Sequence, residues 1–183
     1  MVLKGKKVIL RPIRLSDAER FVKWFNDKTV NKFLTYRSLN LNDQKKWIKE
    51  RLAGKIKNSL HFCIDTTEGI HIGATSLDSI NNFHRRATFG IIIGDKKYWN
   101  KGYGSEAAKL ILNYGFKKLK LHRIDLDVYT YNPRAIKVYK RLGFKEEGRK
   151  IEYTKLGKKF YDAITMSLLD RGWKAKGGEN NGI

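Results

Sequence analysis

Apolar residues in the first part of the chain change from strand-like to helix-like spacing. Residues 8–13 read as a strand. The apolar residues that follow at helical intervals are Ala18, Phe21, Val22 and Phe25. Ser16 and Glu19 form a capping-box pattern, so we expect this helix to begin at 15–16 and to end at Asn26-Asp27.

The middle of the chain alternates turn residues with short apolar runs. The pattern predicts an irregular or short-helical segment over 29–40 and a helix over 41–53, capped by Asn42 and followed by Gly54. Three strands that read as an antiparallel meander follow, over 61–65, 71–80 and 86–93.

The second half alternates helices and strands. Its predicted elements are a helix over 105–119, a strand over 123–129, a helix from Asn132-Pro133 to Leu142-Gly143, and closing strands over 144–151 and 159–169. This order predicts a single α/β (α+β) domain. We expect a central mixed, mostly antiparallel sheet of about seven strands, flanked by four helices.

Composition limits the class of protein. With 183 residues and 41% apolar content, the chain suits one domain, which we assign to 1–173. The glycine- and asparagine-rich tail 174–183 is expected to be disordered. A single cysteine excludes an internal disulfide, and no signal-peptide pattern is present, so we expect a cytoplasmic protein. No apolar run approaches the length of a membrane span.

The net charge of +21 needs an explanation, and three interpretations stay open. The protein binds nucleic acid or a ribonucleoprotein, it binds an anionic small molecule such as a polyphosphate cofactor, or it has a lysine-rich solvated surface. Nucleic-acid binders usually concentrate basic residues on one face or in runs. Here the lysines are spread along the whole chain.

A glycine-punctuated turn connects the strand ending at Ile93-Gly94 to the next helix. Gly102 and Gly104 let an anion approach the backbone amides, and Lys101 adds a cation. The first amides of a helix lack internal partners, and its dipole favours negative charge there. The turn therefore predicts a phosphate or pyrophosphate site, although an ordinary strand-to-helix turn would look similar. The spacing matches neither a nucleoside-triphosphate P-loop nor a dinucleotide fingerprint.

Two motifs resemble those of the GNAT N-acetyltransferase superfamily. The run 98–107 resembles its acetyl-CoA pyrophosphate loop, and the series Asn132, Ala135, Tyr139 and Gly143-Phe144 is similar to its second cofactor motif. The resemblance extends over roughly residues 6–170, and its opening segments are similar to the ribosomal-protein alanine acetyltransferase branch. It implies an acetyl-CoA-dependent N-acetyltransferase, a transferase of the acyltransferase class, with acetyl-CoA as cosubstrate.

The resemblance also implies where the cosubstrate lies. The strands over 86–93 and 123–129 would lie side by side and splay apart. The residues implied in cofactor binding are Ile91, Ile92, Ile93, Asn100, Lys101, Gly102, Tyr103, Gly104, Ser105 and Asn132. Asn132 would reach the pantetheine arm, although it is also a natural helix cap. Tyr139 would be the catalytic proton donor to the leaving thiolate, the alternative being a core aromatic beside Ile136.

The general base stays open. The attacking amine must be neutral, yet a lysine-like amine has a pKa of about 10. Relatives often carry glutamate after the Arg-Arg-Ala of the fourth strand, where this chain has Thr88. The remaining candidates are Asp95, a backbone carbonyl, or a water relay through Thr88 or Tyr36. The four histidines show no metal-ligand spacing and Cys63 reads as a packing residue, so we expect no metal.

The acceptor amine is the least determined part of the prediction. The residues expected around the acceptor pocket are Lys28, Asn31, Lys32, Tyr36, Arg37 and Asn40. Only Asp27 and Asp43 add carboxylates, whereas a polyamine pocket should be acidic. We therefore expect a ribosomal-protein-like N-terminus as acceptor, and a polyamine, amino sugar or nucleotide sugar as the alternative.

Other partners and classes also stay open. Ribosome association and a homodimer are open possibilities, and a membrane partner is not expected. A basic, non-enzymatic module that binds RNA or CoA is the alternative of another class, although no RNA-binding motif is evident. A degenerate acetyltransferase that senses CoA is a further alternative.

Overall fold

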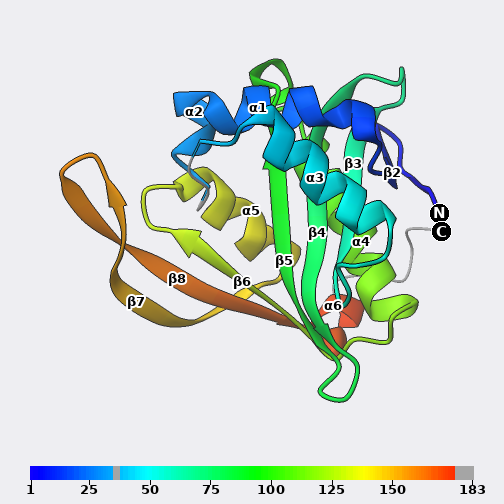
Figure 1. Cartoon of the computed structure of the whole chain (residues 1–183). Coiled ribbons are helices and arrows are strands. Elements are labelled where there is room, and N and C mark those ends of the chain that lie inside the picture. Colours follow the sequence, from blue (N-terminus) through cyan, green and yellow to red (C-terminus); the bar gives the residue numbers. More distant parts are fainter. Residues whose placement is uncertain (35–37, 176–183) are drawn as a thin grey trace.

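The computed structural model describes residues 1–34 and 38–175, and its centre is one eight-stranded sheet (Figure 1). The strand order is β1-β2-β3-β4-β5-β6-β8-β7, and neighbours are antiparallel except for β5 and β6. The strands are β1 (Leu3–Lys4), β2 (Val8–Pro12), β3 (Leu60–Thr66), β4 (His71–Asn81), β5 (Arg86–Ile93), β6 (Arg123–Tyr129), β7 (Lys145–Leu156) and β8 (Lys159–Leu169).

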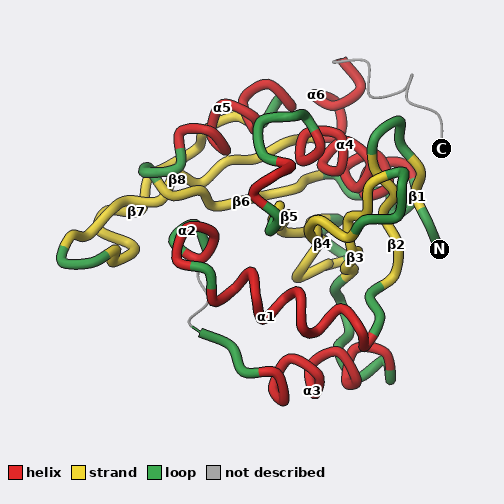
Figure 2. Tube along the Cα trace, turned by 90° about the horizontal axis from the view of Figure 1, so that it is seen from above, coloured by secondary structure: helices red, strands yellow, loops and turns green. Residues whose placement is uncertain are grey.

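Helices cover both faces of the sheet (Figure 2). One face carries α1 and α3, and the other carries α4, α5 and α6. The helices are α1 (Ala18–Asn26), α2 (Lys28–Asn31), α3 (Leu41–Leu52), α4 (Tyr103–Lys117), α5 (Pro133–Leu142) and α6 (Asp170–Ala175). The larger apolar core lies under α4, and a smaller one lies under α1 and α3. No helix in the described part of the chain is long and apolar enough to cross a bilayer.

The predicted fold class is confirmed, and several boundaries agree with the sequence pattern. β5 and β6 have the predicted bounds, and α5 begins after Asn132, whose Oδ1 accepts from the Ala135 amide at 3.2 Å. The sheet has eight strands rather than about seven because Leu3–Lys4 adds a short edge strand, and α2 and α6 add short helices. Most of the predicted tail lies at 176–183, outside the described residues.

Two predicted helix caps are wrong. α1 begins at Ala18 after a 3-10 turn, η1 (Leu15–Asp17), and its N-cap is Asp17 rather than Ser16. The Asp17 carboxylate accepts from the Arg14 amide at 2.7 Å, so no Ser16–Glu19 capping box is formed. α3 is capped by Asn40, whose Oδ1 accepts from the Asp43 amide at 2.8 Å. Asn42 lies inside the first turn, because the backbone is still extended at Asn40.

The helix after the glycine turn also begins earlier than predicted. α4 starts at Tyr103 rather than at residue 105, because Gly102 adopts a left-handed conformation (φ 88°) that ends the loop at once.

A buried arginine on β2 fixes α1 against the sheet. The Arg11 guanidinium donates to both carboxylate oxygens of Asp17, at 2.8 Å each, and its Nε donates to Asp65 at 2.6 Å. Arg11 is 8% exposed, Asp17 is 5% exposed and Asp65 is 9% exposed. Asp17 is the N-cap of α1, and Asp65 lies near the end of β3. The Arg11 side chain therefore joins β2, α1 and β3.

Asp17→Asn is expected to lower the free energy of unfolding by about 3–5 kcal/mol at neutral pH, because it leaves the Arg11 charge buried and half-paired. Burial by itself would raise the pKa of Asp17, but hydrogen bonds from Arg11 and the Arg14 amide outweigh it and lower the pKa to about 2. Because the pKa of Asp17 is lower in the folded than in the unfolded protein, ionised Asp17 stabilises the fold at pH values above its ordinary pKa of 3.8. That stabilisation is lost as the pH falls towards 2.

Urea unfolding between pH 6 and 2 measures this contribution. Between pH 4 and 2, wild type should lose about 2 kcal/mol more than Asp17→Asn. Parallel stability curves for the two proteins in that window would contradict the assigned ion pair.

Candidate active site

β5 and β6 are hydrogen-bonded neighbours over only three residues each. The parallel register pairs Arg86–Thr88 with Arg123–Asp125 and then stops. Beyond this point β6 leaves β5 at an angle (Figure 1). Phe89–Ile93 therefore pairs with β4 on one edge and has no strand partner on the other within the described chain. Unpaired strand edges carry free N–H and C=O groups, so an extended ligand with amide groups can pair there.

The glycine turn lies at the end of this open edge. Asn100 and Gly102 both have positive φ (61° and 88°), and α4 begins directly after them. The amide of Glu106 bonds to Gly102 O, so the amides of 103–105 precede the helical ladder and are available to an anion. The predicted pyrophosphate site thus has the backbone geometry that it needs.

Lys7 brings a second cation to the turn. Its Nζ donates to Lys101 O at 3.2 Å and lies 5.9 Å from the centre of the Tyr103 ring. Its backbone amide donates to Glu106 Oε1 at 2.7 Å, which ties the loop before β2 to the first turn of α4. The sequence reasoning missed this residue, because 94 positions separate it from Lys101.

One predicted backbone contact is already taken. The Trp99 indole donates to Ile93 O at 2.6 Å, and the Arg134 guanidinium lies 4.8 Å from the centre of the Trp99 ring. The Ile93 carbonyl is therefore engaged. Backbone groups alternate along a strand, and those of Gly90 and Gly94 bond to β4, so Ile92 also points its backbone groups to β4 rather than to the free edge. Ile91 stays a candidate for pairing with a pantetheine arm. Arg134 of α5 thus lies over Trp99, the residue that precedes the glycine turn.

Asn132 and Tyr139 of α5 lie on the opposite side of the gap from β5. Asn132 uses Oδ1 as a helix cap, which leaves its amide nitrogen as a donor. The Tyr139 ring packs against Phe89 and Phe144, with centroids 6.0 and 5.9 Å away. Burial raises the pKa of Tyr139 to about 12, so its hydroxyl stays protonated at neutral pH. Tyr139 is thus a packing residue that keeps its proton, and its role as proton donor stays a prediction.

The other face of the gap is lined by alternate residues of the two strands. Ile91 and Ile93 join the core under α4, whereas Ile92 joins the core under α1, so Thr88 and Gly90 share the α1 face with Ile92. On β6, Leu126 and Val128 are buried on the α4 side, so Asp125 and Tyr129 face the α1 side. Thr88 and Asp125, the last pair of the β5–β6 register, therefore share the α1 face at the closed end of the gap.

The predicted base candidates are not brought together. Asp95 accepts from the Lys97 amide at 3.0 Å and caps the 3-10 turn η2 (Lys96–Tyr98). Tyr36 and Arg37, both expected near the acceptor, lie outside the described residues. Thr88 does face the acceptor side, but it has no carboxylate.

A family model described as "Acetyltransferase (GNAT) domain" matches residues 7–145. The chain belongs to the GNAT acetyltransferase family. This confirms the predicted acetyl-CoA-dependent N-acetyltransferase, and the open gap and the glycine turn lie within the matched region.

Relatives of this GNAT protein include several N-acetyltransferases. An uncharacterized N-acetyltransferase p20 from Bacillus licheniformis is 28% identical, over 92% of this chain and 96% of the relative. A spermidine N(1)-acetyltransferase from Escherichia coli K12 is 37% identical over 109 residues, which cover 60% of this chain and 58% of the relative. None of the relatives compared singles out the ribosomal-protein branch.

Solved structures share the fold. A spermidine N-acetyltransferase from Vibrio cholerae, solved with CoA and spermine, superposes with a TM-score of 0.86 at 24% identity, over 93% of this chain and 99% of that one. A GNAT-family acetyltransferase from Bacillus anthracis gives a TM-score of 0.79 at 26% identity, over 93% of this chain and 99% of that one.

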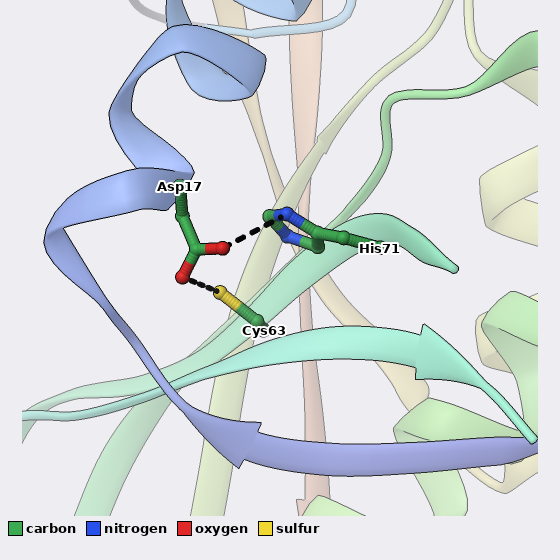
Figure 3. A group of neighbouring side chains, drawn as sticks. All are labelled: Asp17, Cys63 and His71. Atoms are coloured by element: carbon green, nitrogen blue, oxygen red, sulfur yellow. Dashed lines mark hydrogen bonds and ion pairs between the residues drawn. The ribbon is translucent and has the colours of Figure 1, made fainter. Parts of the chain in front are cut away.

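A buried cluster of Asp17, Cys63 and His71 lies between α1 and the sheet of this GNAT domain (Figure 3). Their ligand-type atoms lie within 4.8 Å of one another. Cys63 Sγ donates to Asp17 Oδ2 at 3.2 Å, and His71 Nδ1 lies 3.3 Å from Asp17 Oδ1. Both carboxylate oxygens also accept from Arg11, whose positive charge would oppose a metal ion. We therefore interpret the cluster as structural; the expectation that the protein uses no metal stays a prediction.

Neither Cys63 nor His71 is placed to take part in catalysis. Cys63 is 0% exposed and His71 is 6% exposed. Burial raises the pKa of the Cys63 thiol and lowers the pKa of the His71 imidazole. The thiol therefore stays protonated and out of reach of a substrate, in agreement with the packing role expected from the sequence.

Gly102→Ala is expected to weaken acetyl-CoA binding about tenfold, because alanine disfavours the left-handed backbone that aims the helix amides at the pyrophosphate. Gly54→Ala is the matched control: Gly54 also has a positive φ (69°) and has open space at the Cβ position, but it follows α3. Both variants should lose about 1 kcal/mol of stability. Calorimetric titration with acetyl-CoA checks this, and equal affinities for the two variants would refute the turn as the pyrophosphate site.

Proposed function

We propose that this GNAT enzyme transfers the acetyl group of acetyl-CoA to a small primary amine. The observation that carries the proposal is the early end of the β5–β6 pairing, which leaves one edge of β5 without a strand partner in the described chain, next to the glycine turn. The relatives named as spermidine N(1)-acetyltransferases support a small acceptor over the protein N-terminus expected from the sequence. The family membership also argues against a non-enzymatic RNA-binding module.

An aromatic cluster around Tyr131 lies beside the proposed acceptor face. The Tyr131 hydroxyl donates to Lys32 O at 2.7 Å, and its ring stacks on Phe33 with centroids 6.2 Å apart. Tyr131 also stacks on Tyr129 at 5.2 Å and meets Tyr161 edge-on at 4.9 Å. These contacts join the end of α2 to the segment that follows β6, on the α1 side of the sheet.

The local charges do not single out a polycation among small amines. Asp27 accepts from the Thr29 and Val30 amides and pairs with Lys96 Nζ at 2.6 Å. Asp43 is hydrogen-bonded to Asn40. Both carboxylates that the sequence offered for this region are therefore engaged. Monoamines and amino sugars accordingly belong in the substrate panel beside polyamines.

The site residues would divide the chemistry between the two faces of the gap. The amides of 103–105, with Lys101 and Lys7 beside them, would hold the pyrophosphate. The free edge of β5 would align the thioester arm, and a backbone amide there would stabilise the oxyanion of the tetrahedral intermediate. Tyr139 would donate a proton to the departing thiolate sulfur as the carbon–sulfur bond breaks.

Tyr139→Phe is expected to lower kcat about 100-fold while leaving the Kd for acetyl-CoA within twofold, because the ring packing is kept and only the donor is lost. Tyr114→Phe is the matched control, since Tyr114 packs edge-on against Phe62 at 6.5 Å. Stopped-flow thiol release measures both variants. A folded Tyr139→Phe enzyme with nearly full turnover would remove Tyr139 from the mechanism.

A thiol-release assay over a panel of amines tests the proposed function directly. We expect acetyl-CoA to raise the melting temperature, and the best small amine to exceed Ala- and Ser-starting peptides at least tenfold in kcat/KM, or about 1.4 kcal/mol in transition-state binding. The panel holds spermidine, spermine, monoamines and amino sugars. Faster turnover of the peptides would restore the protein N-terminus as the preferred acceptor.

A further inference from the structure

Thr88 occupies the position where a carboxylate is expected, and a carboxylate lies directly across the ladder from it. The parallel register of β5 and β6 pairs Thr88 with Asp125. We propose that Asp125 is the group that accepts the proton of the acceptor amine, through a water molecule or the Thr88 hydroxyl. This inference rests on the proposed function and adds the general base that the sequence left open.

The position of Asp125 follows from the register. Thr88 and Asp125 form the last pair before the strands separate, so Asp125 lies at the closed end of the gap. Neighbouring strands lie about 4.8 Å apart, and paired side chains point to the same face. The Asp125 carboxylate therefore lies on the same face as the Thr88 side chain, about one strand spacing away from it. That face is the α1 side, opposite the side on which Tyr139 packs.

The ion pairs around Asp125 leave it the least engaged carboxylate beside Thr88. Arg123 forms a two-pronged pair with Glu147 (2.9 and 2.5 Å), and Glu147 also accepts from Ser167. Asp125 Oδ1 lies 2.5 Å from Arg123 Nη2 but makes no hydrogen bond of good geometry within the described chain. The Asp125 side chain is 23% exposed, so solvent can reach it.

Two neighbouring carboxylates are more fully occupied. Asp78 of β4 pairs with Thr88 from the other side, but its two oxygens are held by His61 Nε2 at 2.5 Å and Ser76 Oγ at 2.6 Å. Asp127 is held by Lys150 Nζ at 2.6 Å and Thr165 Oγ at 2.7 Å. Asp78 also lies on the far side of β5 from the gap.

The proton balance of the step is simple. The ammonium gives one proton to the Asp125 carboxylate through the relay, and the neutral amine attacks the thioester carbonyl carbon. As the new carbon–nitrogen bond forms and the carbon–sulfur bond breaks, Tyr139 gives its proton to the thiolate sulfur, and the second proton that the nitrogen loses restores the Tyr139 hydroxyl by way of solvent. Asp125 then releases its proton to water. The products are the amide, the free thiol and one proton, and no further reactant is needed.

Asp125→Asn tests the proposal in a pH series with the best small amine of the panel. At pH 7 the variant should lose about 100-fold in kcat/KM, because few amine molecules are neutral there. Near pH 10 the loss should shrink below about tenfold, since the amine then needs no base. Asp127→Asn is the matched control on the same strand and should stay within about threefold of wild type at every pH.

A carboxylate introduced at position 88 distinguishes a catalytic role of Asp125 from a structural one. Thr88→Glu added to Asp125→Asn should restore activity at pH 7 to within about tenfold of wild type. Melting temperature and acetyl-CoA affinity check that each variant is folded, and Asp125→Ser replaces Asp125→Asn if the latter is not. An unchanged rate and pH profile in a folded Asp125 variant would overturn the proposal while leaving the proposed function intact. Failure of wild type to acetylate any small amine would overturn both.

Discussion

The position of the proposed site depends on the short parallel pairing of β5 with β6. β5 and β6 share three residues of register and then diverge, so a strand in the middle of the sheet has one free edge. A free edge inside a sheet is costly unless something pairs with it or water reaches it. We propose that acetyl-CoA meets this requirement here, because an arm with amide groups can pair with the free edge of β5. The anion turn, the oxyanion donor and the acceptor face are all defined relative to this gap.

The helices of the fold lie on the two faces of the sheet around this gap (Figure 2). α4 and α5 lie on one face and supply the helix amides and the Tyr139 donor. α1 lies on the other face, fixed by the buried Arg11–Asp17 pair. Replacing a buried ion pair with apolar residues is often neutral for stability, so we interpret its value here as positional: it fixes where α1 begins. Tyr131 then joins the end of α2 to the segment after β6.

Local sequence patterns predicted most of the helices, the strands and the glycine turn. They could not predict which strands pair with one another. The cap at Asn132, the bounds of β5 and β6 and the glycine turn follow from neighbouring residues. The cap of α1 was assigned wrongly because Asp17 binds Arg11 and the Arg14 amide, and the first of these contacts crosses from β2. Lys7 and Asp125 were not found as site residues, since their positions depend on which strand pairs with which. Nothing in the neighbouring residues places Thr88 opposite Asp125.

Hydrogen–deuterium exchange with and without acetyl-CoA tests the central claim most directly. If the arm pairs with the free edge of β5 and the pyrophosphate lies on the α4 amides, acetyl-CoA should slow exchange in 89–93 and in 103–105. Exchange in β3, which has strand partners on both edges, should be unchanged. Protection that spares 89–93 and 103–105, or that appears elsewhere in the sheet, would contradict the gap as the site of acetyl transfer.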